Sequence, residues 1–131
     1  MILPKPKRDQ APLQPMINGR EALLELQKSA LAALQAGHQA YLAAYARQDP
    51  ETEQLHLRNH QLDAIAARLE AAILRQVGED LLSLASRAKQ AQATLARQLA
   101  QLQALANTAA TVAKIAASLD KIITILAKVL G

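Results

Sequence analysis

The stretch 111–131 constrains the fold of this chain more than any other. Apolar side chains recur there at alternating spacings of three and four, which is typical of a heptad row on a helix. This apolar face consists of Val112, Ile115, Leu119, Ile122, Ile123, Leu126, Val129 and Leu130. The polar remainder is a narrow strip around Lys114, Ser118, Lys121 and Lys128. So apolar a helix must be the buried part of a bundle, a subunit contact or a membrane-seeking surface.

The composition predicts an all-α fold. Hydrophobic residues make up 51% of the 131 residues, but aromatic residues make up only 2%, namely Tyr41 and Tyr45. Alanine and leucine supply most of the hydrophobic content, and both favour helices, whereas strands favour β-branched and aromatic residues. Because each alanine buries little area, we expect stability to come from long, close helix contacts.

The same composition argues against several classes of function. The chain has no cysteine, which excludes a disulfide framework, a thiolate zinc site and a cysteine nucleophile. We recognise no phosphate-binding loop and no nucleophile elbow, and therefore expect neither enzymatic activity nor a cofactor. A net charge of +4, with no aromatic residue in a basic context, does not indicate nucleic-acid binding. We recognise no secretory signal and no transmembrane stretch; the sequence does not determine the compartment, and a cytoplasmic location is the default.

The chain is predicted to divide into a proline-rich extended arm, residues 1–17, and a helical domain, residues 18–131. Four of its five prolines are Pro4, Pro6, Pro12 and Pro15. Proline disfavours helix and favours extended backbone, so the arm is either a disordered leader or a segment that docks along a partner. Asn18, with Glu21 three residues later, is expected to cap the first helix.

The first helix is expected to pack through a row of larger side chains. This row consists of Leu24, Gln27, Leu31, Leu34, His38, Tyr41 and Tyr45. His38 would then lie in the helix seam, either fixing the register or acting as a pH-sensitive residue. A second row, Leu23, Leu26, Ala30 and Ala33, is expected to widen this face, and Gly37 allows close backbone approach.

Asp49 and Pro50 mark the clearest boundary, since Asp suits a helix cap and Pro suits the first helical position. The second helix is expected to run to about Val77 and to end at Gly78. Its apolar face consists of Leu55, Leu62, Ile65, Ala66, Leu69, Ile73 and Val77. The short connection that follows predicts an antiparallel hairpin with the next helix.

One polar row on the second helix resembles a set of metal ligands. Glu53, His56, His60 and Asp63 are spaced three, four and three residues apart, so they share one helical face. That face lies opposite the apolar one and should point to solvent. We therefore interpret the row as a solvated surface and expect no metal, with these four residues as the only candidate ligands.

The stretch from Glu79 to Leu130 contains no glycine or proline and keeps heptad-like spacing. If the helix is continuous, the fold is a long antiparallel hairpin with an extended amphipathic C-terminal helix. If it breaks at Asn107-Thr108, where Asn can close a helix and Thr open the next, the fold is a four-helix bundle. The unbroken spacing favours the continuous helix.

Two functional hypotheses follow from this pattern. The first is a structural interaction protein that self-associates or binds another helical protein, with the 111–130 face as the main contact. The alternative is a membrane-active helical protein, peripheral or pore-forming, that places the same face on or in an anionic bilayer.

Overall fold

The computed structural model describes residues 13–75, 78–108 and 110–131, and within these ranges it consists of helices joined by turns, with no strand. Four helices follow one another: α2 (Leu13–Ala46), α3 (Thr52–Arg75), α4 (Gly78–Ala106) and α5 (Val112–Leu130). The predicted all-α class is therefore confirmed. Of the two architectures considered, the structure adopts the four-helix bundle.

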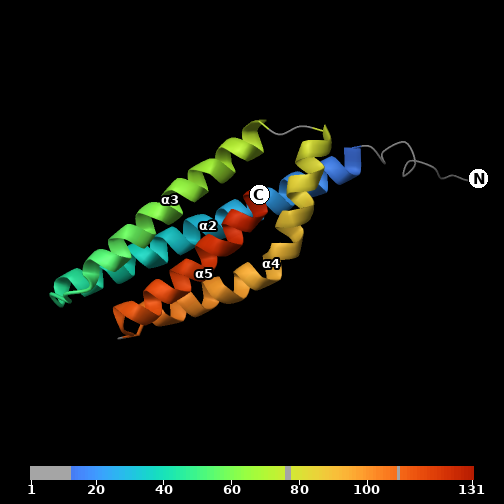
Figure 1. Ribbon diagram of the computed structural model, residues 1–131. Helices are drawn as coiled ribbons and strands as arrows, with labels where there is room; N and C mark the ends of the chain where they lie inside the picture. The colour runs from blue at the N-terminus through green and yellow to red at the C-terminus, as the bar shows by residue number, and fades with distance from the viewer. Residues whose placement is uncertain (1–12, 76–77, 109) are drawn as a thin grey trace, which may run out of the picture.

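The helices are arranged so that sequence neighbours are not always spatial neighbours (Figure 1). α2 packs against both α3 and α4, and α5 packs against the same two helices from the other side. α3 and α4 diverge from their connection and lie at opposite corners, so the hairpin predicted between them is wrong. Figure 1 also shows that α4 is bent, with its second half running beside α5.

The chain turns back between Ala106 and Thr111, so the expectation of a continuous helix is wrong. The apolar spacing persists across the turn because both helices present their rows to one core. Asn107 does not close α4 in the left-handed conformation, since Gln48 is the only described non-glycine residue with positive φ. Thr111, rather than Thr108, caps α5, and its hydroxyl accepts the Lys114 amide at 3.4 Å.

We expect Thr111→Ala to lower the free energy of unfolding by about 1 kcal/mol, the usual cost of removing a capping hydroxyl. Thr111→Ser keeps the acceptor and should lie within a few tenths of a kcal/mol of the native protein. Urea denaturation of both variants measures the difference. If the Ser variant is as unstable as the Ala variant, the cap is not the reason for the loss.

The first helix begins at Leu13, not at Asn18, so the helical domain extends into the segment predicted to be an extended arm. Pro15 is the third helical residue, and a proline is tolerated in the first turn because amides there have no intrahelical acceptor. Proline therefore did not exclude helix at 13–17. Residues 1–12, the rest of the predicted arm, lie outside the described residues.

Gln48 ends α2 with backbone geometry that usually belongs to glycine. Its φ is 57°, its amide donates to Tyr45 O at 3.0 Å, and the Asp49 amide donates to Ala44 O at 3.0 Å. This pair of bonds is the Schellman motif. Asp49 then accepts the Glu51 amide through Oδ1 at 2.9 Å, which starts the turn into α3 as the sequence predicts.

Replacing Gln48 with Gly should raise the free energy of unfolding by roughly 0.5–1 kcal/mol, because a side chain in the left-handed region is strained and glycine is not. Ala43→Gly, at an exposed position inside α2, is the matched control and should cost about 1 kcal/mol. Chemical denaturation would contradict the assigned cap if both glycines destabilised the protein equally.

The buried face of α2 is the small-residue row, not the row of larger side chains. It consists of Leu23, Leu26, Ala30, Ala33, Gly37, Ala40 and Ala44, all buried. The two rows lie one residue apart along α2 and have the same heptad spacing, so periodicity alone does not separate them. Small side chains face the core because three helices approach α2 closely there. The larger side chains do not fit between these helices and therefore lie on the outer side of α2.

At Gly37, α2 and α3 are in close contact. Its carbonyl accepts a hydrogen bond from Asn59 Nδ2 at 3.0 Å. A Cβ at this position would overlap Asn59 Oδ1 and lie 3.3 Å from Leu119 Cδ2. The absence of a side chain at Gly37 therefore lets α3 and α5 pack against the backbone of α2.

Candidate interaction surface

The apolar face of α5 lies inside the bundle. Its buried members are Val112, Ile115, Leu119, Ile122, Leu126 and Val129, while Ile123 and Leu130 are partly buried. Ser118 is also buried, at 3% exposure, so its place in the polar strip was predicted wrongly; Lys114, Lys121 and Lys128 are exposed. In this structure the face is an intramolecular contact with α3 and α4, and a partner could reach it only if the bundle opened.

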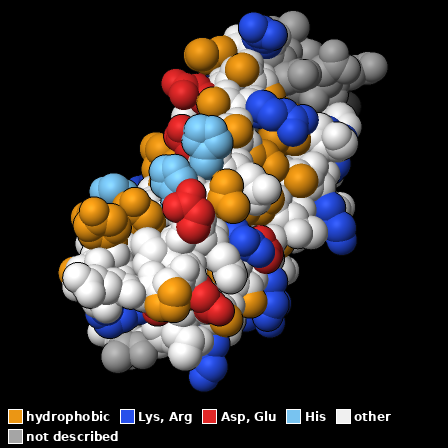
Figure 2. Space-filling view, turned by 60° about the vertical axis from the view of Figure 1, so that its left-hand side comes forward, with side chains coloured by type: hydrophobic (Ala, Val, Ile, Leu, Met, Phe, Trp, Pro, Cys, Tyr) orange, Lys and Arg blue, Asp and Glu red, His pale blue; other side chains and the backbone are white. Residues whose placement is uncertain are grey.

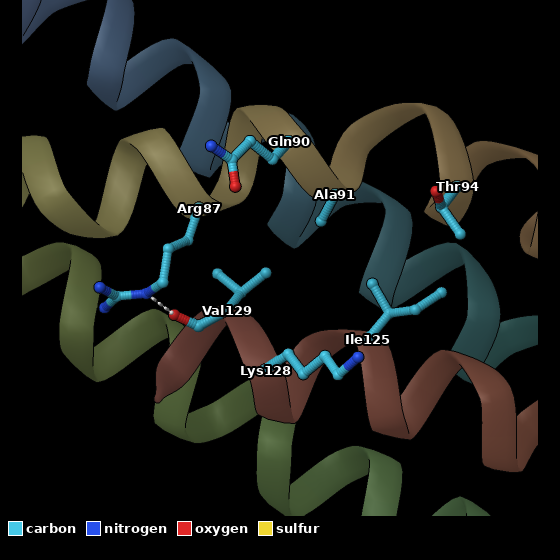
Figure 3. Close-up of a pocket in the computed structure, with 7 residues that line it drawn as sticks. All are labelled: Arg87, Gln90, Ala91, Thr94, Ile125, Lys128 and Val129. Carbon is cyan, nitrogen blue, oxygen red and sulfur yellow. Dashed lines mark hydrogen bonds between the residues drawn. The ribbon is translucent and has the colours of Figure 1, made fainter.

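Two polar contacts hold α5 against its neighbours. Arg58 on α3 donates to both carboxylate oxygens of Asp120, at 3.2 and 3.5 Å. From α4, Arg87 Nε donates to the Val129 carbonyl at 2.8 Å, as Figure 3 shows. A carbonyl in the last turn of a helix has no intrahelical donor, so a cationic side chain there satisfies it and opposes the helix dipole.

A shallow groove of about 300 Å³ lies beside this second contact, between α4 and α5. Figure 3 shows Ile125, Lys128 and Val129 of α5 facing Arg87, Gln90 and Thr94 of α4 across it. Arg87 also donates to Ser83 Oγ at 2.9 Å, so its guanidinium is engaged within the chain. Arg87 therefore holds α5 against α4 beside the groove, and its guanidinium is not free to bind a ligand there.

The row of larger side chains on α2 faces outward, and we call it the outer row. It consists of Leu24, Gln27, Leu31, Leu34, His38, Tyr41 and Tyr45. Leu31 is 55% exposed and Tyr45 is 69% exposed, while Leu34 and Tyr41 are partly buried. Leu42, beside the row, is 51% exposed. The residues expected to fill the core thus lie towards the outside of the bundle, four of them exposed and three partly buried, and one of the exposed residues is the predicted seam residue His38.

The outer row lies on a helix with an unusual lack of charge. From Ser29 to Ala46 the sequence contains no aspartate, glutamate, lysine or arginine. Solvent-facing helix surfaces are normally charged, whereas the centres of protein interfaces are depleted of charge and enriched in tyrosine. This absence of charge was visible in the sequence and indicates a covered surface, whether the cover is the same chain or another one.

Aromatic rings connect the outer row to α3. The Tyr41 ring lies 6.4 Å from that of His38, 6.2 Å from that of Tyr45 and 5.6 Å from that of His56 on α3. His38 is exposed, so the predicted burial in a helix seam is wrong. Figure 2 shows the histidine side chains on one face, with hydrophobic and acidic side chains between them. These rings form a surface that is apolar at its centre and can accept or donate hydrogen bonds at its edge.

The candidate metal row lies on the exposed side of α3. Glu53, His56, His60 and Asp63 are all exposed, as their position opposite the apolar face predicts. Within the described ranges, no group of three or more His, Asp or Glu side chains is placed to hold a metal ion. The contact that the structure does give this row is the one between His56 and Tyr41.

In the parts of the chain that the structure describes, none of the helices combines the length and the apolar character needed to cross a membrane. No protein-family model, curated protein or solved structure matches the chain.

Proposed function

We propose that this chain is a structural interaction protein, without enzymatic activity or cofactor, that binds another helix through the outer row of α2. The observation that carries the proposal is the charge-free heptad row from Leu31 to Tyr45, of which Leu31, His38 and Tyr45 are exposed. A contiguous apolar surface on a folded protein is typical of a binding site. Heptad spacing fits a helix as the ligand, because the side chains of one helix then insert between those of the other.

The proposed partner-binding surface lies on α2 and not on α5, where the sequence pattern predicts it. The 111–130 face is occupied by the rest of the bundle, and its exposure would require the loss of the hydrophobic core. The membrane-active alternative requires the same opening, because the apolar side chains that would enter a bilayer are those that hold the bundle together. The outer row of α2 is accessible without any such change.

The proposal is tested by a photo-reactive amino acid placed at Leu31 or Leu42, followed by irradiation in cells that produce the protein. Both side chains are more than half exposed, so the substitution leaves the core intact. Matched control positions are Ala100 on α4 and Lys121 on α5, which are exposed on other faces. We expect the α2 positions to cross-link one defined protein, identified by mass spectrometry, and the controls not to do so.

Two results would contradict the proposal. Cross-linking from Leu31 and Leu42 that does not exceed that from Ala100 and Lys121 would show that the outer row has no preferred partner. Cross-linking mainly to lipid would instead support the membrane-active alternative.

A further inference from the structure

We propose that the pocket at the turn between α2 and α3 binds an alkylammonium group. The pocket has a volume of about 620 Å³ and lies where the last turn of α2 meets the first turn of α3. Two parts of its lining carry the proposal: a pair of tyrosine rings from α2 and a pair of carboxylates at the start of α3. Because the pocket does not require a helix bound along the outer row, the inference goes beyond the proposed function.

Tyr41 and Tyr45 supply the aromatic part of the lining. They lie one turn apart on the same side of α2, and their ring centroids are 6.2 Å apart. Tyr41 is partly buried and lies 5.6 Å from the His56 ring, whereas Tyr45 is 69% exposed and leaves most of its ring open to a ligand. A cation within about 6 Å of such a ring is attracted to the negative charge of its face.

Asp49 and Glu53 supply the charged part of the lining. Asp49 is partly engaged within the chain, because its Oδ1 accepts the Glu51 amide at 2.9 Å and its Oδ2 lies 3.8 Å from Arg47 Nη2. Glu53 is exposed and forms no ion pair with another described residue. Glu53 is therefore the carboxylate available to pair with a bound cation.

The charges around the pocket select a cation over an anion. Among the described residues that line it, none is a lysine or an arginine. The C-terminal end of α2 and the N-terminal end of α3 meet beside the pocket, and their opposite partial charges offset each other. The two carboxylates therefore determine the sign of the ligand. The rings select an organic cation over a metal ion, for which the described residues offer no group of three ligands.

An NMR titration of the intact chain with choline chloride tests the site. Tyr41 and Tyr45 are the only tyrosines, so their ring signals report directly on the pocket. We expect these signals to shift saturably with a dissociation constant of roughly 1 mM, since the pocket is open to solvent. The neutral isostere of choline, in which carbon replaces nitrogen, should bind at least about tenfold more weakly. Equal binding of the two compounds, or no saturation by choline up to tens of millimolar, would overturn the site.

Two substitutions at exposed residues locate the bound cation. Tyr45→Leu removes a ring and leaves Tyr41 as the reporter, while Glu53→Gln removes the charge and keeps the shape. Each should weaken choline binding about threefold or more and leave the helical circular dichroism spectrum unchanged. Glu70→Gln is the matched control, because Glu70 is an exposed carboxylate roughly 25 Å further along α3. Equal weakening by Glu53→Gln and Glu70→Gln would attribute the effect to net charge and would overturn the site.

Arg47→Gln should have the opposite effect. Arg47 is exposed and pairs with Asp49 at the edge of the pocket, so its guanidinium competes with a bound cation for that carboxylate. Its removal should tighten choline binding about twofold or more. Unchanged or weaker binding would contradict the assignment of the carboxylates as the cation-binding groups.

A second ligand, N-acetyl-lysinamide, distinguishes the two sources of an alkylammonium group. We expect choline to bind more tightly, because a quaternary ammonium is recognised mainly by aromatic rings. Tighter binding of the lysine derivative would assign the pocket to a lysine side chain of a partner protein, which is the same chemistry from the other source. Failure of both ligands to bind would overturn the site without affecting the proposed function, which cross-linking from Leu31 and Leu42 tests separately.

Discussion

Leu119→Ala is expected to lower the free energy of unfolding by about 2–5 kcal/mol, the range for leucine truncation in a packed core. Leu119 lies in the middle of α5 with no exposed surface, and its Cδ2 occupies the space beside Gly37 of α2, 3.3 Å from where a Cβ would lie. Truncation removes apolar area and leaves a cavity between helices that cannot close without separating other contacts. Small domains have only about 5–15 kcal/mol of stability, so the loss should be visible in a urea transition and in the melting temperature.

The matched comparison for this prediction is a polar side chain outside the core. His56 is exposed on α3, so His56→Ala should change the free energy of unfolding by well under about 1 kcal/mol. If His56→Ala proves the more damaging of the two, the assignment of faces to α3 and α5 is wrong.

Gly37→Leu is expected to destabilise the bundle by roughly 1–3 kcal/mol or more, because extra volume in a close-packed contact forces backbone and side chains apart. This loss of stability is opposite to the effect expected from helix propensity, which favours leucine over glycine by up to about 1 kcal/mol. The reason is the contact geometry: the first atom of any side chain at Gly37 meets Asn59 Oδ1. Chemical denaturation of the variant gives the sign directly.

A double-mutant cycle assigns this cost to Asn59. Gly37→Ala should destabilise the native protein, since the added methyl group displaces Asn59 from its bond to the Gly37 carbonyl. In an Asn59→Ala background the overlap with Oδ1 is gone and the 3.3 Å contact with Leu119 Cδ2 remains, so the same substitution should cost clearly less than in the native protein. An unchanged effect in the two backgrounds would place the obstruction elsewhere.

The parts of the fold that the sequence predicts are those that local chemistry determines. Abundant Ala and Leu determine helix, Asp49-Pro50 determines the boundary between α2 and α3, and Leu55 to Ile73 determine the buried face of α3. In each case a single residue type or one unambiguous apolar row decides the outcome. The all-α class follows from these elements without knowledge of how the helices pack.

Three features depend on packing between distant segments and escape this kind of reasoning. The core row of α2 could not be identified because small residues are buried only when other helices come close, as at Gly37. The turn at Asn107 to Thr111 interrupts no apolar spacing, so the sequence does not distinguish it from a continuous helix. The placement of α3 and α4 at opposite corners follows from how all four helices share one core.

The candidate surface was visible in the sequence but was assigned to the wrong side of the helix. The outer row has the larger side chains, and size suggested burial. The charge-free stretch from Ser29 to Ala46 fits a covered surface equally well, whether the cover is the same chain or another one. Only the packed structure, in which Leu31 remains exposed, shows that the bundle itself does not supply the cover.

The apolar face of α5 is buried within one chain, whereas Leu31 in the outer row of α2 is accessible to a partner. Single cysteines at Leu31, Ile122 and the exposed control Lys121 test both statements through their rates of thiol labelling in dilute protein. We predict slow labelling at Ile122 and fast labelling at both Leu31 and Lys121. Fast labelling at Ile122, or labelling at Leu31 as slow as that at Ile122, would contradict this arrangement.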